Sequence, residues 1–127
     1  MEKLLNALDT NGGTDPLGMF PLFLKETSKV LAPKLSAVFR RLLRSGSFPK
    51  CWRVANITPI PKGPPSARVS NYRPISITPL LSKVFEHLVS TRLSSFLERS
   101  SLLSPNQFAY RKNLGTTDAL LTISHKL

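Results

Sequence analysis

The fold of this chain is decided by residues 48–78, which read FPKCWRVANITPIPKGPPSARVSNYRPISIT. β-Branched residues gather on both sides of a segment rich in proline and glycine, two residue types that oppose a helix there. We expect two short strands, residues 53–60 and 73–78, and the first ends before a proline because proline has no N–H to donate to a ladder. The pattern therefore predicts a β-hairpin with a cationic tip that carries Lys62 and Arg68.

Helical spacing before the hairpin predicts a pair of helices, residues 21–30 and 33–44. Each is opened by a proline, whose missing N–H costs nothing in a first helical turn. In the second helix Leu35, Phe39 and Leu42 recur at the intervals of one helix face. We expect this stripe to pack inward, the opposite face to keep its cations in solvent, and the following glycine to end the helix.

A longer apolar pattern after the hairpin predicts a helix over residues 79–99, with Thr78 as its N-cap and Pro79 in its first turn. Apolar residues cover more than half of its circumference, so we expect it to be the central helix of the core. Residues 107–112 then alternate in the manner of a short strand.

A last helix is expected to begin with a cap at Thr116 or Thr117 and to reach residue 127. Its apolar stripe has no partner later in the sequence. This suggests that the sequence is cut from something longer.

The composition carries one strong functional signal, an excess of positive charge. The 127 residues include 18 Lys and Arg against 7 Asp and Glu, a formal net charge of +11. Such an excess repels itself in a compact state, so a polyanionic partner is expected, and nucleic acid is the favoured one. A solvated basic surface is the alternative. A membrane surface is disfavoured because the cations are spread over loops and helix ends.

Length and cysteine content restrict the remaining possibilities. A chain of 127 residues with 41% hydrophobic composition suits one globular domain with a modest core. The single cysteine, Cys51, cannot form an internal disulfide, and no zinc-type spacing joins it to His87 or His125. Neither a signal peptide nor a membrane segment is predicted, so an intracellular compartment is expected, nucleus or cytoplasm.

An ordered series of motifs spans most of the chain. The series is Phe48-Pro49, Trp52, Ala55, Pro59-Ile60-Pro61-Lys62, Asn71-Tyr72-Arg73-Pro74-Ile75-Ser76, Leu81-Ser82-Lys83-Val84-Phe85-Glu86, Arg92-Leu93 and Gln107-Phe108-Ala109-Tyr110-Arg111-Lys112. It resembles the N-terminal (fingers) part of the reverse transcriptase domain of non-LTR, LINE-type (jockey-like) retrotransposons, in the same order and at similar spacing. The likeness covers residues from about Asp15 to the C-terminus.

The resemblance implies an α+β fold, a helical fingers-type module with a short β-hairpin that forms a truncated part of a polymerase right-hand fold. Residues 1–18 are expected to be a poorly ordered N-terminal segment, and residues 19–127 a partial reverse transcriptase domain without its palm. Where the family has a Gly-Pro-Asp-Gly-Ile type turn, this chain has residues 13–19, Gly-Thr-Asp-Pro-Leu-Gly-Met. Ala109 and Asn113 stand where the wider family favours glycine.

Polymerase chemistry needs two divalent metals held by clustered carboxylates. The aspartates here are Asp9, Asp15 and Asp118, and no two are adjacent. None resembles the family's metal-binding blocks. We therefore expect no catalytic residue, no cofactor bound by this chain and no catalysis by it unaided. Mg²⁺ is expected only for the full-length family domain.

The resemblance also indicates which side chains meet nucleic acid. Arg73, Lys62, Lys83, Arg111 and Lys112 are expected to contact nucleotide or template phosphates. Gln107 and Phe108 are expected to line the template path. For each of them the competing interpretation is a surface cation or a core aromatic, and for Arg73 it is an ion pair with a core carboxylate such as Glu86.

Three functional hypotheses remain open at this point. The first is a fragment of an RNA-directed DNA polymerase, whose partners are RNA and DNA (template and primer) together with the missing palm and thumb regions. The second is a stand-alone, non-enzymatic nucleic-acid-binding or interaction module derived from a retrotransposon. The third is a decayed genomic copy that does not fold stably. An Asp-containing strand and a Tyr-x-Asp-Asp hairpin later in the same reading frame would favour the first.

Overall fold

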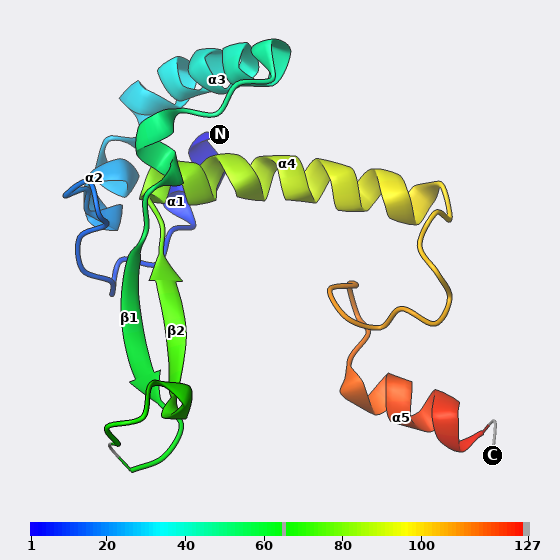
Figure 1. The fold of residues 1–127 in the computed structure, drawn as a ribbon. Coiled ribbons are helices and arrows are strands. Elements are labelled where there is room, and N and C mark those ends of the chain that lie inside the picture. Colours follow the sequence, from blue (N-terminus) through cyan, green and yellow to red (C-terminus); the bar gives the residue numbers. More distant parts are fainter. Residues whose placement is uncertain (65, 126–127) are drawn as a thin grey trace. The chain divides into compact units, whose positions relative to one another are not determined.

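A computed structural model describes residues 1–64 and 66–125 of the chain. Helices and one antiparallel two-stranded sheet make up its regular structure, which confirms the α+β class. The chain divides into two compact units, Met1–Leu88 and Val89–Leu127. The boundary falls within a single long helix, α4 (Leu80–Arg99), whose first turns belong to the first unit and whose later turns belong to the second (Figure 1).

The predicted hairpin is present, with β1 (Asn56–Pro61) paired antiparallel to β2 (Tyr72–Ile77). The backbone N–H of Lys62 donates to the carbonyl of Asn71 at 2.8 Å and closes the ladder at the loop end. The first strand begins later than predicted because residues just before it form a short 3₁₀ helix, η1 (Lys50–Arg53). Figure 1 shows the hairpin projecting from the helices of the first unit.

Four aromatic rings form the centre of the first unit. Phe39 and Phe85 lie 5.1 Å apart between ring centroids, and Trp52 stands edge-on to Phe39 at 6.0 Å. Phe48 contacts both Trp52 and Phe85. The rings come from a helix, a loop, η1 and the start of α4, so their burial fixes those four segments together and anchors the base of the hairpin.

The helix pair before the hairpin differs from the prediction at its boundary. The structure has α2 (Pro21–Glu26) and then one long helix, α3 (Ser28–Ser45), with Pro33 in its interior. The predicted start at Pro33 is therefore wrong. Tertiary contact explains the earlier start, since buried Ser28 donates a hydrogen bond of 2.7 Å to Asn6 in the N-terminal helix.

Two other expectations about these helices are confirmed. Pro21 occupies the first turn of α2, where its missing N–H has no intrahelical partner to lose. Gly46 ends α3 in the left-handed conformation, with φ of 60°. A side chain at this position would be strained, which explains why a glycine follows the helix.

The N-terminal residues include a short helix, α1 (Glu2–Asn6), which packs against α2 and α3. Its Leu5 side chain is fully buried. This short helix is therefore tied to the packed part of the first unit. The expectation that residues 1–18 are poorly ordered concerns mobility and stays a prediction.

Burial along α4 is uneven, which corrects the prediction of a central core helix. Its buried residues, Leu80, Ser82, Val84 and Phe85, all lie in the first two turns. In the second unit the helix surface is open, and Phe96 is 52% exposed. The apolar pattern of α4 thus exceeds what the described residues cover. No helix of the described ranges is long and apolar enough to cross a membrane.

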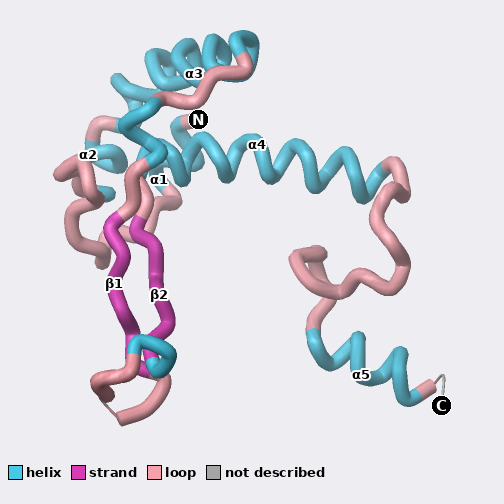
Figure 2. The backbone as a smooth tube through the Cα atoms, in the orientation of Figure 1, coloured by secondary structure: helices cyan, strands magenta, loops and turns pink. Residues whose placement is uncertain are grey.

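The segment between α4 and α5 (Thr116–Ser124) contains turns and no strand, which corrects the strand predicted at residues 107–112. Figure 2 shows it as loop throughout. Alternation alone was misleading here because an isolated strand has no ladder partner, and Tyr110 adopts a positive φ of 61° that interrupts an extended chain. The last helix is confirmed, although residue 127 of the prediction lies outside the described residues.

The N-cap of α5 lies one residue before the first of the predicted caps, so Thr116 is the first helical residue instead of the cap. Gly115 is its N-cap, and its backbone N–H donates to the Asp118 carboxylate at 2.7 Å. This is the reciprocal half of a capping box, and it also places a negative charge in the first turn, where the helix dipole favours it.

Candidate nucleic-acid interface

Arg73 lies on the open surface of the hairpin. It is opposite Ile60 in the ladder, so the two side chains share a face with Ile75 and Ile77 by the alternation of the strands. All residues of β1 are exposed, as are all those of β2 except the half-buried Tyr72. This face combines one cation with exposed apolar side chains, which suits a ligand that offers both a phosphate and a flat apolar surface.

The Arg73 guanidinium makes no hydrogen bond or ion pair with the residues at 1–64 and 66–125. The alternative partner, Glu86, accepts a hydrogen bond of 2.6 Å from the buried Ser82 hydroxyl instead. The structure therefore gives the side chain of Arg73 no structural partner. Its donors are available to a ligand.

Lys62 lies at the same end of the hairpin as Arg73, one residue beyond the Pro61–Tyr72 pair. Its ammonium donates to the Ser70 carbonyl at 2.8 Å, a contact that holds the two sides of the loop together. Lys62 thus has a structural role in shaping the loop. Its charge nevertheless remains exposed at the tip.

Lys83 lies elsewhere in the first unit, at a hollow of about 510 Å³ between residues 8–21, the base of the hairpin and the start of α4. Asp15 borders the same hollow, and its carboxylate is hydrogen-bonded to the backbone. Its carboxylate accepts hydrogen bonds from the N–H groups of Leu17 and Met19, both at 2.8 Å, and of Leu80 at 2.7 Å. Asp15 thereby caps the N-terminus of α4 from 65 residues away in the sequence.

The ionisation of Asp15 is favoured by this arrangement. Burial opposes the charged form, but hydrogen bonds from Leu80, Met19 and Leu17 outweigh burial, and together with the charge of Lys83 they hold the pKa of Asp15 below its usual value. Lys83 therefore already faces an anion of its own chain. The part it could play toward an external phosphate is reduced accordingly.

The remaining predicted contacts lie in the second unit, where Arg111 is held by Glu98. Its Nε and one Nη donate to the two carboxylate oxygens at 2.9 and 2.7 Å. This paired hydrogen bond lowers the pKa of Glu98 and raises the pKa of Arg111, against an opposing effect of desolvation. The other terminal nitrogen reaches the Ser104 carbonyl at 3.4 Å, so Arg111 offers fewer free donors than Arg73.

The neighbours of Arg111 differ in their exposure. Lys112 is exposed, and its side chain has no polar partner among the described residues. Phe108 is half-buried, and the Gln107 amide donates weakly to the Ala109 carbonyl at 3.4 Å. The structure thus brings Gln107, Phe108, Arg111 and Lys112 into one loop of the second unit, and Arg73 and Lys62 onto one hairpin of the first.

Arg111→Ala is expected to release this loop while leaving the first unit unchanged. Amide hydrogen exchange of residues 100–114 should accelerate, because Glu98 loses the partner that ties the loop to α4. The melting temperature should change little, since a surface ion pair whose side chains are still 20% and 37% exposed contributes little to global stability. Lys112→Ala is the matched control and should leave exchange unaltered. Unchanged exchange in Arg111→Ala would show that the pair does not hold the loop.

The sequence leaves three arginines of α3, Arg40, Arg41 and Arg44, equally compatible with a backbone-phosphate contact and with a structural role at the helix end, and they are not among the contacts selected above. Their position in the last turns of a helix offered a sufficient structural explanation by itself. The signal that could have found them is their clustering on the outward side of a helix that contains no acidic residue. They surround a surface hollow together with Ala37 and Ser45.

The sequence is similar to several curated proteins of mobile elements. It is 36% identical over 87 residues to the probable RNA-directed DNA polymerase from transposon X-element of Drosophila melanogaster, which covers 68% of this chain and 10% of that protein. It is 35% identical over 85 residues to the corresponding probable polymerase from transposon BS, 66% of this chain and 9% of that protein. The RNA-directed DNA polymerase from mobile element jockey is 36% identical over 87 residues, with coverage of 68% and 10%. No family model matches.

This chain is homologous to the RNA-directed DNA polymerases of non-LTR retrotransposons. The resemblance inferred from the ordered motifs is thereby confirmed. The chain spans about a tenth of the length of the curated relatives that it matches. The activity of those whole proteins is therefore a matter of proposal for this chain.

Two departures from the family pattern gain a physical explanation from the backbone. Asn113, where the resemblance places a glycine, adopts φ of 62°, and asparagine is among the few residues that tolerate this left-handed conformation. The turn at residues 13–19 retains an aspartate, Asp15, and Gly18 within it has φ of 75°. The turn of this chain therefore supplies the cap of α4.

Proposed function

We propose that this chain is the fingers-type part of an RNA-directed DNA polymerase and that it supplies contacts to template and nucleotide phosphates. The observation that carries this proposal is Arg73, an exposed guanidinium without a partner among the described residues, on a hairpin face that also exposes Ile60, Ile75 and Ile77. Homology to RNA-directed DNA polymerases supports nucleic acid as the partner. The net charge of +11 supports it independently.

The metal-binding carboxylates of such a polymerase are proposed to come from its palm, outside these residues. Each aspartate here already accepts hydrogen bonds from its own backbone: Asp9 from Asn11, Asp15 from three N–H groups and Asp118 from Gly115. Within the described ranges, no three His, Cys, Asp or Glu residues are grouped to hold a metal ion. Mg²⁺ belongs to the proposal only through the full-length domain, where it would activate the primer hydroxyl and stabilise the leaving pyrophosphate.

Arginine suits the role proposed for position 73. Tyr72 precedes it and Pro74 follows it, so the backbone is held extended and the side chain leaves the strand in a defined direction. A guanidinium presents paired donors that match two phosphate oxygens, whereas an ammonium acts as a point charge. Ile60 and Ile75, 44% and 48% exposed, flank it and can cover a base or sugar.

The purified chain is expected to bind single-stranded RNA and DNA weakly, with affinity that falls steeply as salt rises, because binding releases counterions. Arg73→Ala should weaken binding by roughly tenfold, about 1.4 kcal/mol, and Arg73→Lys by less. Fluorescence anisotropy with labelled oligonucleotides over a salt series measures both effects.

The matched control is Arg92→Ala, which removes the same charge from an exposed position on α4. It should weaken binding less than Arg73→Ala does. Equal losses of affinity in the two variants would show that Arg73 acts only through the net charge of the chain. Affinity that does not vary with salt would overturn the proposed nucleic-acid contact altogether. In a full-length polymerase that carries this module, Arg73→Ala should raise the KM for nucleotide or lower turnover while thermal unfolding stays the same.

A further inference from the structure

The charged residues of helix α3, in the first unit, are all cationic. Its eighteen residues include Lys29, Lys34, Arg40, Arg41 and Arg44 and no acidic residue. All five side chains are exposed. None of the five makes a hydrogen bond or ion pair with residues in the described part of the chain, so their charges are unneutralised within it.

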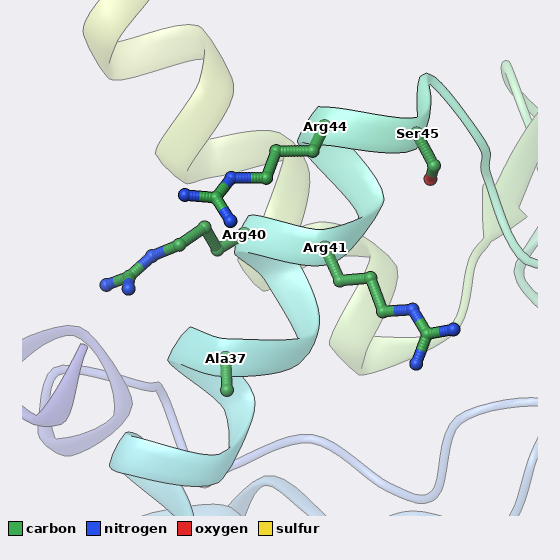
Figure 3. Close-up of a pocket in the computed structure, with 5 residues that line it drawn as sticks. All are labelled: Ala37, Arg40, Arg41, Arg44 and Ser45. Atoms are coloured by element: carbon green, nitrogen blue, oxygen red, sulfur yellow. The ribbon is translucent and has the colours of Figure 1, made fainter.

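The three arginines are arranged around a small residue. Arg40 and Arg44 extend to the same side of α3, Arg41 extends to the other side, and Ala37 lies between (Figure 3). The short Ala37 side chain leaves a hollow of about 500 Å³ that these residues line together with Ser45. The hollow is open to solvent and is bordered on both sides by guanidinium groups. An extended anion can therefore lie across the helix and be held from two sides.

The arrangement is unfavourable unless an anion is present. Arg40 and Arg44 are four residues apart, and like charges at this spacing repel and destabilise a helix. The helix dipole compensates only near the C-terminus, mainly at Arg44. A bound phosphate would remove the repulsion and would accept paired hydrogen bonds from each guanidinium.

The apolar residues of α3 argue against a membrane surface as the partner of its arginines. Ser28, Ala32 and Phe39 are buried in the first unit, so the inward stripe of this helix is already used. The exposed apolar residues do not form one continuous face: Leu43 is turned by about 140° from both Val30 and Val38, because each residue turns the direction by about 100°. By the same geometry, Lys34 and Arg41 lie between the two valines. An interfacial helix needs one free apolar face beside its charges, which α3 lacks.

We propose that Arg40, Arg41 and Arg44 form a seat for the phosphodiester backbone of a single nucleic-acid strand, separate from the hairpin contact at Arg73. We expect the seat to bind strands of any sequence, because phosphate contacts position a strand and carry no sequence information. This inference needs nucleic-acid binding by the chain, as the proposed function does, but it does not need the role proposed for Arg73.

The test compares the full chain with the variant R40Q/R41Q/R44Q and the control K3Q/K50Q/R92Q, which removes three exposed charges elsewhere. Binding to oligo(U), oligo(dT) and a duplex is measured over a salt series. The α3 variant should lose more than tenfold in affinity for the single strands at low salt. Its slope of log affinity against log salt should flatten by about two, since each lost phosphate contact on a single strand is worth roughly 0.7.

The control variant should lose clearly less affinity, although its net charge falls by the same amount. Equal losses would show that overall charge alone drives binding and would overturn the seat. A loss seen with oligo(U) alone or oligo(dT) alone would also overturn it, since a phosphate seat accepts either backbone. Circular dichroism should show both variants folded, with the α3 variant melting no lower than the parent because repulsion is relieved.

Two further measurements separate this inference from its rivals. When Arg73→Ala is combined with R40Q/R41Q/R44Q, the losses of binding free energy should add, as expected for two independent contacts. If the combination loses no more affinity than one change alone, the two sets of residues form a single contact, and the separate seat is overturned. Vesicles containing phosphatidylserine should not bind the chain through α3. Vesicle binding that the α3 variant abolishes, with oligonucleotide affinity unchanged, would reassign these arginines to a membrane surface.

Discussion

Phe85→Ala is expected to destabilise the first unit by about 3–5 kcal/mol, the usual cost of emptying a buried aromatic site. Phe85 is 8% exposed and contacts the other three rings of the aromatic cluster, Phe39, Phe48 and Trp52. Its removal leaves a cavity at the point where α3, η1 and α4 meet. A loss of this size approaches the whole stability of a small domain, so the variant should be largely unfolded at room temperature.

The measurement uses Trp52, which is the single tryptophan of the chain and belongs to the cluster. Its emission should shift to the red in Phe85→Ala. Phe85→Leu keeps most of the volume and should remain folded, with a loss of about 1.5 kcal/mol or less. The matched control is Phe96→Ala on the same helix, where the side chain is 52% exposed and a change within about 0.5–1 kcal/mol is expected. Equal losses at positions 85 and 96 would contradict the uneven burial of α4.

Asp15→Ala is expected to cost about 2–3 kcal/mol at neutral pH, through the loss of a helix cap and of hydrogen bonds to a charged acceptor. Three backbone N–H groups lose their acceptor, including that of Leu80 at the start of α4. Asp15→Asn should lie between the parent and Asp15→Ala, because one amide oxygen replaces two carboxylate oxygens. Thermal or urea unfolding of the three proteins measures these differences.

The contribution of Asp15 should also depend on pH in a predictable direction. The folded state lowers the pKa of Asp15, so the unfolded chain takes up the proton first as the pH falls. The stabilisation is therefore complete above the unfolded pKa, about 3.9 for an aspartate, and is lost as the pH falls through the lower, folded value. The gap in stability between the parent and Asp15→Asn should shrink through this acid range.

The control for the pH effect is Asp9→Asn, which removes an exposed carboxylate with one local acceptor role toward Asn11. Its stability should follow that of the parent at every pH. A constant gap between the parent and Asp15→Asn from neutral to acid pH would mean that the charge of Asp15 does not stabilise α4.

The candidate site was predictable only in part, because the sequence identifies residue types but not their partners. The hairpin position of Arg73 follows from strand patterning, and its lack of a structural partner appears only once Glu86 is seen bonded to Ser82. Arg111 carries the same chemistry in the same series of motifs. Its bond to Glu98 distinguishes it from Arg73 and joins residues 13 positions apart through a turn that periodicity does not predict.

Local chemistry determined what the sequence by itself could establish about this protein. Pro21 at the start of α2 and Gly46 at the end of α3 act through their own backbone preferences, so they are readable wherever they occur. The hairpin follows for the same reason. The homology to RNA-directed DNA polymerases was recognisable from the sequence on another ground, the order of its short motifs.

Tertiary structure decided the features in which distant residues compete with local preference. Pro33 does not open α3, because the turns before it are held by Ser28 against Asn6, and the packing of those turns outweighs one lost backbone hydrogen bond. The start of α4 is set by Asp15 from 65 residues away, where the sequence pointed to Thr78 beside it. Where these helices begin depends on which side chains meet in space. The pattern along the chain does not contain this information, because an acceptor or a buried face has no fixed sequence distance from the group it stabilises.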